Sequence, residues 1–165
     1  MTTKTDYTAE EWGQLMQAPI LAGTYLIIAD LAVTSVFKET AGMSKAILAQ
    51  PVPEDAQDLV GALVADFQDK SKDKDAKSDF DLTDEQKKDP EATKAAMLTE
   101  IEEAANLVAE KGSAEEATGY KKWIMGVAQA TAEAGREGGF LGIGSVRVSD
   151  QEKAALAELS SGLGL

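Results

Sequence analysis

The segment GREGGFLGIGSVRVS, residues 135–149, differs in its chemistry from the rest of the sequence. Five of its fifteen residues are glycine, and it contains the only two arginines of the chain, Arg136 and Arg147. Exposed backbone amides, the start of a helix at Ser149 and a guanidinium beside it could together hold an anion. The glycine spacing fits neither a Walker loop, which requires lysine and then serine or threonine, nor a dinucleotide fingerprint, which follows a strand.

Asp30 is the second residue with chemical interest, because it lies inside the apolar segment APILAGTYLIIADLAVTSVF, residues 18–37. It is the only acid that the hydrophobic pattern itself buries. A structural ion pair or hydrogen bond, for example to Lys45, would explain such an acid as well as a functional role would. We therefore expect the Asp30→Asn variant to fold with altered stability.

Two interpretations of the glycine-rich segment stay open. In the first, its glycines end a helix and form a joint, and Phe140, Leu141 and Ile143 fold back over the open end of a helical bundle. In the second, the segment closes a pocket between helices, with Asp30 and both arginines as polar anchors. The candidate ligand-binding residues of this second interpretation are Asp30, Arg136, Gly138, Gly139, Phe140, Gly142, Gly144 and Arg147.

The residue types that are missing exclude several kinds of site. The chain contains no cysteine and no histidine. A disulfide framework, a thiol nucleophile and a zinc–thiolate site are therefore excluded, and so is a di-iron centre that depends on Glu-x-x-His pairs. Glu102, Glu103 and Glu110 lie outside the apolar positions of their helix, so we expect them to face solvent.

The segment DKSKDKDAKSDF matches only the first half of a calcium-binding EF-hand loop. Asp69, Ser71, Asp73 and Asp75 occupy its positions one, three, five and seven. Lysine replaces the glycine that the sharp turn requires, and phenylalanine replaces the glutamate that closes the site. We expect no metal site and no cofactor.

The formal net charge of −13 over 165 residues narrows the range of partners. A surface this negative repels phosphate backbones, so we expect no nucleic-acid binding, whereas a cationic partner would be attracted. Residues 18–37 are long enough to span a bilayer, but Pro19, Gly23 and Asp30 interrupt them, and a buried helix is the better interpretation. No apolar run follows Lys4, so no signal peptide is predicted, and we expect a cytoplasmic protein.

Capping residues divide the sequence into helices. Thr8 and Glu11 predict the start of a short helix that ends near Pro19. A long apolar helix is expected from Pro19 to about Ala49, with a possible break at Gly42. An amphipathic helix then starts at Pro53, residues 69–81 form a mobile charged loop, and helices are expected at 90–111, at 113–135 and, after a cap at Ser149, at the C-terminal end.

Apolar spacing indicates how these helices pack. Met97, Ile101, Ala104 and Val108 recur at intervals of four and three residues, which is the spacing of a helix face that packs against another helix. The connection to the helix at 113–135 is so short that the two must lie antiparallel. We predict an all-α fold, an antiparallel bundle of four principal helices with short terminal helices and a glycine-rich loop before the last one, as a single domain over residues 1–165.

The C-terminal segment EGGFLGIGSVRVSDQEKAALAEL resembles the signature of a group of small, acidic, helical bacterial proteins of uncharacterised function. The resemblance extends more loosely to EEWGQLMQAPILAGTYLIIADLA and ATGYKKWIMGVAQATAEA. Ser145 stands where the signature would have another glycine. The resemblance implies a helical fold and a bacterial cytosolic protein, and it implies no particular activity.

These patterns favour a non-enzymatic binding protein that acts through self-association or through a protein partner. The contact would come from an exposed part of residues 20–37, or from Trp12 and Trp123. The alternative is a small-molecule carrier or enzyme, with a pocket between helices that the 135–149 segment closes.

Overall fold

The computed structural model describes residues 1–29, 36–72, 86, 88–134 and 148–165, and this part of the chain is helical without strands. The predicted all-α fold is confirmed. The helices in chain order are η1 (Lys4–Asp6), α1 (Ala9–Ala29), α2 (Val36–Ala49), η2 (Glu54–Ala56), α3 (Gln57–Lys72), α5 (Pro90–Lys111), α6 (Ala114–Ala134) and α7 (Asp150–Leu163).

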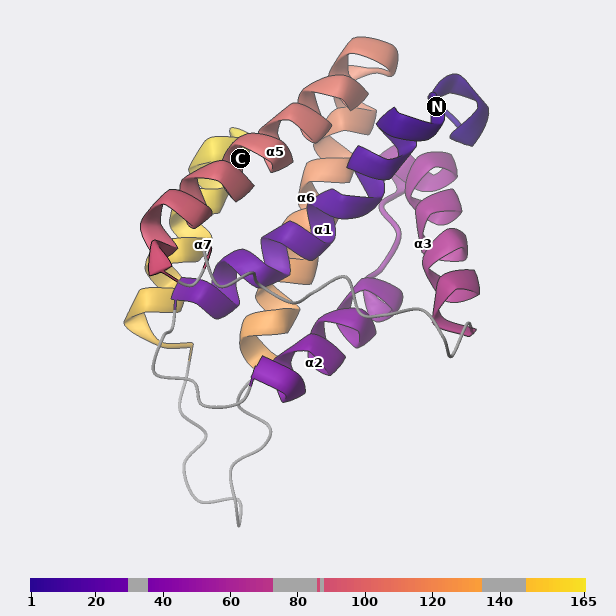
Figure 1. Ribbon diagram of the computed structural model, residues 1–165. Helices are drawn as coiled ribbons and strands as arrows, with labels where there is room; N and C mark the ends of the chain where they lie inside the picture. Colours follow the sequence, from indigo (N-terminus) through magenta and orange to yellow (C-terminus); the bar gives the residue numbers. More distant parts are fainter. Residues whose placement is uncertain (30–35, 73–85, 87, 135–147) are drawn as a thin grey trace.

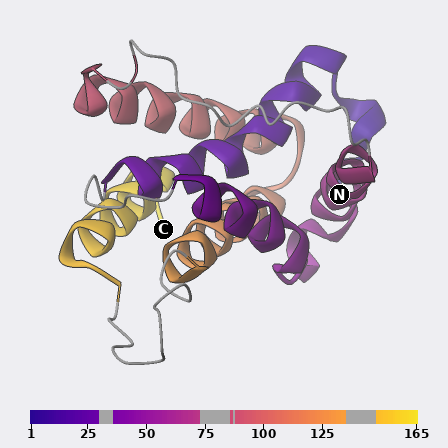
Figure 2. The same ribbon diagram turned by 60° about the horizontal axis from the view of Figure 1, so that its bottom comes forward.

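Helix α1 lies at the centre of the molecule. It contacts each of the other α-helices, and its most extensive contacts are with α5 and α6. Figure 2 shows α5 on one side of α1, with α7, α6 and α2 on the other side. As predicted from their short connection, α5 and α6 form an antiparallel hairpin (Figure 1). Helix α1 is therefore the helix around which the other α-helices pack.

The predicted helix boundary at Pro19 is wrong, because α1 continues through this residue to Ala29. A proline inside a helix has no N–H to donate to the carbonyl four residues earlier, which here is Leu15. The hydroxyl of Tyr120, on α6, donates to this carbonyl oxygen over 2.8 Å. Tyr120 is fully buried, and burial raises its pKa well above the usual value, so the hydroxyl keeps its proton. The tertiary hydrogen bond replaces the helical one and lets α1 pass Pro19.

Two further boundaries differ from the sequence-based prediction. The long apolar helix expected from Pro19 to Ala49 is two helices, α1 and α2, which pack against each other. The charged loop expected at 69–81 is wrong for its first residues, because Asp69–Lys72 form the last turn of α3, and residues 73–81 lie outside the described residues. Lys72 pairs with Asp69 over 2.8 Å within that turn, which supports the helix at its end.

The core consists largely of the residues that helical spacing selects. Met97, Ile101, Ala104 and Val108 are all buried on α5, and the buried side chains of the described helices form one cluster. Trp12 is 6% exposed and Trp123 is 1% exposed. The suggestion that these two tryptophans supply a surface for a partner is therefore wrong, because both contribute to the core.

Candidate binding groove between α1 and α5

The ligand-binding residues predicted from the sequence are not placed by the structure. Asp30, Arg136, Gly138, Gly139, Phe140, Gly142, Gly144 and Arg147 all lie outside the described residues. Asp69 and Ser71 belong to α3, so they do not start an EF-hand loop. Across the described ranges, no group of three or more acidic side chains is arranged to hold a metal ion. None of the described helices has the length and apolarity needed to cross a bilayer.

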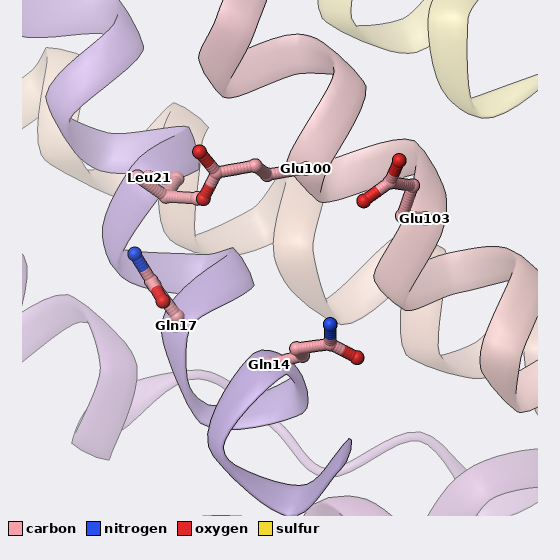
Figure 3. Close-up of a pocket in the computed structure, with 5 residues that line it drawn as sticks. All are labelled: Gln14, Gln17, Leu21, Glu100 and Glu103. Atoms are coloured by element: carbon pink, nitrogen blue, oxygen red, sulfur yellow. The ribbon is translucent and has the colours of Figure 1, made fainter. Parts of the chain in front are cut away.

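A groove of about 190 Å³ lies between α1 and α5, at a place that the sequence did not indicate. Figure 3 shows that α1 and α5 face each other across it, with the carboxylate of Glu100 directed towards Leu21. Gln14, Gln17, Glu100 and Glu103 are exposed and Leu21 is partly buried. The residues that line the groove are Gln14, Gln17, Leu21, Glu100 and Glu103.

Helix geometry places these side chains together. Gln14, Gln17 and Leu21 are three and four residues apart, so they share one face of α1. Glu100 and Glu103 are three residues apart and share one face of α5. The residues between them in sequence turn inward, and the buried positions on both helices hold the two backbones at a fixed distance. The groove is therefore built on two rigid helices.

Lysines of α5 close the α1–α5 interface at both ends. At one end, Lys111 Nζ pairs with a carboxylate oxygen of Glu11 over 2.7 Å. At the other end, Lys94 Nζ lies 5.2 Å from the ring centre of Tyr25 and 3.4 Å from a carboxylate oxygen of Glu158, on α7. Tyr25 donates a hydrogen bond of 2.7 Å to the same carboxylate oxygen. Each end thus combines a cation with a carboxylate.

These contacts shift the pKa values of Glu11, Glu158 and Tyr25. The hydrogen bond from Lys111 is the main cause of a lowered pKa at Glu11. The hydrogen bond from Tyr25 is the main cause of a lowered pKa at Glu158, and Lys94 acts in the same direction. Burial, followed by the hydrogen bond to Glu158, raises the pKa of Tyr25. Both carboxylates are therefore charged at neutral pH, and Tyr25 is a donor.

Within the described residues, no cation lies at the middle of the same interface. Among the described residues, no lysine pairs with Glu100 or Glu103, and α1 presents amides and a leucine opposite them. Two carboxylates and two amide oxygens are acceptors that suit an ammonium or a guanidinium. A general acid or base would need a desolvated carboxylate, and both glutamates are exposed. The arrangement supports binding of a cation rather than proton transfer.

Sequence reasoning placed Glu103 in solvent, and this is confirmed, since its side chain is exposed. What it missed is that the exposed side chain borders a groove. On α1, the polar residues Gln14 and Gln17 lie on one face of the helix, and this spacing could have indicated a polar lining. The pairing of α1 with α5 was not predictable from local spacing, because these helices are far apart in the chain.

Comparisons with protein-family models, with curated proteins and with solved structures found no match. The resemblance of the C-terminal segment to a group of bacterial proteins therefore stays a prediction.

Proposed function

We propose that this chain is a non-enzymatic interaction protein that takes a basic side chain of a protein partner into the α1–α5 groove. The observation that carries the proposal is the charge pattern of the interface. Lysines close it at both ends, whereas Glu100 and Glu103 in its middle face no cation within the described helices. The proposal keeps the cytoplasmic location expected from the sequence.

The size of the groove favours a side chain over a free ligand. Pockets for small molecules usually enclose about 300–1,000 Å³. The volume here is about 190 Å³, and its lining comes from two helices only. A single side chain of a larger partner fits this space, while the rest of the partner would contact the surrounding helix surfaces.

The net charge favours a different protein over a second copy of the chain. Two molecules that each carry −13 repel each other, and the repulsion is strongest at low ionic strength. A basic partner is attracted by the same field, which accelerates its association. We therefore expect the isolated chain to be a monomer in low salt.

The small-molecule carrier or enzyme considered from the sequence has no described contact in its support. Its proposed anchors, Asp30, Arg136 and Arg147, lie outside the described residues.

The experiment is a binding titration of the full chain with tetralysine as the probe. The Glu100→Gln/Glu103→Gln variant is compared with Glu54→Gln/Asp58→Asn, which removes two exposed carboxylates near the start of α3. Both variants change the net charge equally, so the control accounts for long-range attraction. We expect the dissociation constant to rise about tenfold in the groove variant, as for two surface ion pairs, and less than about twofold in the control.

Chemical-shift changes upon addition of tetralysine locate the binding. They should concentrate at Gln14, Gln17, Glu100 and Glu103. Equal weakening in both double variants, with shifts spread over the acidic surface, would mean that the probe senses only net charge and would refute the groove. A stable dimer in low salt would instead favour self-association.

A further inference from the structure

Three helices of this chain start with the same motif, a serine or threonine followed three residues later by glutamate. In a capping box, the hydroxyl accepts from the glutamate amide while the carboxylate accepts from the amide of the capping residue. Thr8 and Glu11 complete both bonds at the start of α1, over 3.2 and 2.7 Å. Ser149 and Glu152 complete both at α7, over 3.1 and 2.7 Å. These two boxes are closed.

The third box, at the start of α6, is half open. The amide of Glu116 donates to Ser113 Oγ over 3.2 Å, as the motif predicts. The Glu116 carboxylate does not return to the Ser113 amide. Its Oε1 accepts from the Thr2 amide over 2.6 Å and from the Thr2 hydroxyl over 2.9 Å. In the described part of the chain, no acceptor is found for the Ser113 amide.

This diversion leaves the carboxylate poorly satisfied. Glu116 is 1% exposed, and its Oε2 has no hydrogen-bond partner among the described residues. A buried carboxylate oxygen without a partner is costly. The oxygen packs on the backbone of Gly112, where a Cβ would collide with it. Rotation about the side-chain bonds would bring the Glu116 carboxylate to the Ser113 amide, which is the position that the glutamates of the other two boxes occupy relative to their capping residues.

The N-terminal segment that Glu116 holds, residues 2–7, is fastened to the bundle mainly by polar contacts. Lys4 pairs with Asp66 on α3, and Lys111 Nζ donates to the carbonyl oxygen of Asp6 over 3.1 Å. The ring of Tyr7 packs 6.0 Å from that of Trp12 and is the main apolar contribution of the segment. Figure 1 shows the N-terminus beside α3, at one end of the bundle. Departure of the segment would expose the rings of Tyr7 and Trp12, whereas its other anchors are polar contacts that water can replace.

We propose that residues 2–7 open from the bundle as a unit while the helices stay folded, and that Glu116 then exchanges Thr2 for the Ser113 amide. The two states differ in which amide the carboxylate accepts from. In the closed state, the segment covers Trp12 and Glu116 is buried. In the open state, the capping box of α6 is complete and the indole of Trp12 is accessible. The inference is independent of the α1–α5 groove.

The Gly112→Ala variant tests the exchange without changing the N-terminal segment. The added methyl group occupies the space of the buried Glu116 Oε2 and also comes within 3.0 Å of the Val108 carbonyl oxygen; the flexible carboxylate can yield more easily than the backbone and should move to its capping position. The Gly112 backbone has φ near −110°, which alanine tolerates. Native-state hydrogen exchange should show the amides of Asp6 and Tyr7 exchanging about tenfold faster, because the hydrogen bonds from Thr2 to Glu116 are lost. The Ser113 amide should exchange more slowly.

Gly61→Ala is the matched control, since a Cβ there meets nothing within 4 Å. It should leave all these exchange rates unchanged. Thr2→Val is a second opening variant, which removes the hydroxyl bonds to Glu116 and Tyr7 and should give the same pattern. If the N-terminal amides exchange as slowly as the core amides of α6 in every variant, the segment opens only with global unfolding and the proposal fails. It fails equally if the segment opens and the Ser113 amide does not gain protection.

Discussion

The carboxylates at the two ends of the α1–α5 interface have different surroundings from those in its middle, and the carboxylate at one end comes from α7. At the ends, Glu11 and Glu158 each have a lysine within 4 Å and at least one further hydrogen bond. In the middle, Glu100 and Glu103 border a groove without a cation from the described residues. The ends fasten helices to one another, whereas the two carboxylates in the middle are exposed and have no lysine partner among the described residues.

The difference shows what a charged residue contributes at each place. A pair at the end of an interface adds a small stabilisation, typically below about 1 kcal/mol when exposed. Two neighbouring carboxylates that have no cationic partner repel each other slightly and do not stabilise the fold. The proposed binding of a basic side chain would explain their position better than a role in stability. Substitutions at the ends and in the middle should therefore differ in their effects on stability.

The largest effect is expected from Tyr120→Phe, which removes the hydroxyl that supports α1 beside the groove. The Tyr120 hydroxyl takes the place of the N–H that Pro19 lacks as donor to the Leu15 carbonyl. Without it the carbonyl is left unpaired, so we expect a loss of about 1–3 kcal/mol in the free energy of unfolding. Urea denaturation followed by circular dichroism measures it. In a Pro19→Ala background the helix regains its own donor, and Tyr120→Phe should cost clearly less. An unchanged cost would show that the hydrogen bond does not compensate for the proline.

Breaking either end should have a moderate effect. Lys94→Met removes two ion pairs and a cation–π contact, and Lys111→Met removes one ion pair, a cation–π contact and the hydrogen bond to the Asp6 carbonyl oxygen. We expect each variant to cost up to about 1 kcal/mol. The side chain of Lys94 is 13% exposed and that of Lys111 is 31% exposed, so Lys94→Met should cost more. Urea midpoints in low and high salt check this. The reverse order, or no cost in low salt, would contradict the role assigned to the ends.

The ends also predict an acid dependence of stability. The pKa values of Glu11 and Glu158 are lowered in the folded chain, so the stability that they contribute is present above their ordinary value of 4.5. It is lost as the pH falls through the lowered values. The urea midpoint of the native sequence should therefore fall more steeply below pH 4.5 than that of Glu158→Gln. Parallel curves would mean that the contact with Tyr25 does not affect the ionisation of Glu158.

The smallest effect on stability is expected from Gln17→Lys, which supplies the cation that the middle lacks. Its ammonium can reach Glu100 and Glu103 across the groove, so we expect a gain of a few tenths of a kcal/mol. Gln68→Lys, at an exposed position of α3, gives the same change of net charge as a control. Thermal unfolding of both variants compares them. A larger gain in the control would argue that only the net charge matters.

Local sequence signals predicted helix starts and missed long-range support. Thr8 and Ser149 each cap the helix that they were expected to cap, because a capping bond involves residues three positions apart. The predicted helix end at Pro19 was wrong because the contact that lets the helix continue is not local. The donor that compensates for the proline, Tyr120, lies 105 residues from Leu15 in the chain. No local pattern contains that contact.

The sequence predicted only some features of the candidate groove. The exposure of Glu103 followed from the apolar spacing on its helix, and polar positions at 14 and 17 follow from the pattern around Trp12 and Leu15. Which helix faces α1 did not follow, because only the short connection between α5 and α6 fixed a pair. Glu116 shows the same limit, since its motif predicted a cap and Thr2 redirects the carboxylate.

The most direct measurement is the affinity of the Gln17→Lys variant for tetralysine, compared with that of Gln68→Lys. If the groove between Glu100 and Glu103 receives a basic side chain, the built-in lysine should occupy it and raise the dissociation constant about tenfold. The control should change it less than about twofold, because it alters only the net charge. Equal dissociation constants for the two variants would show that the groove is not where the basic side chain binds.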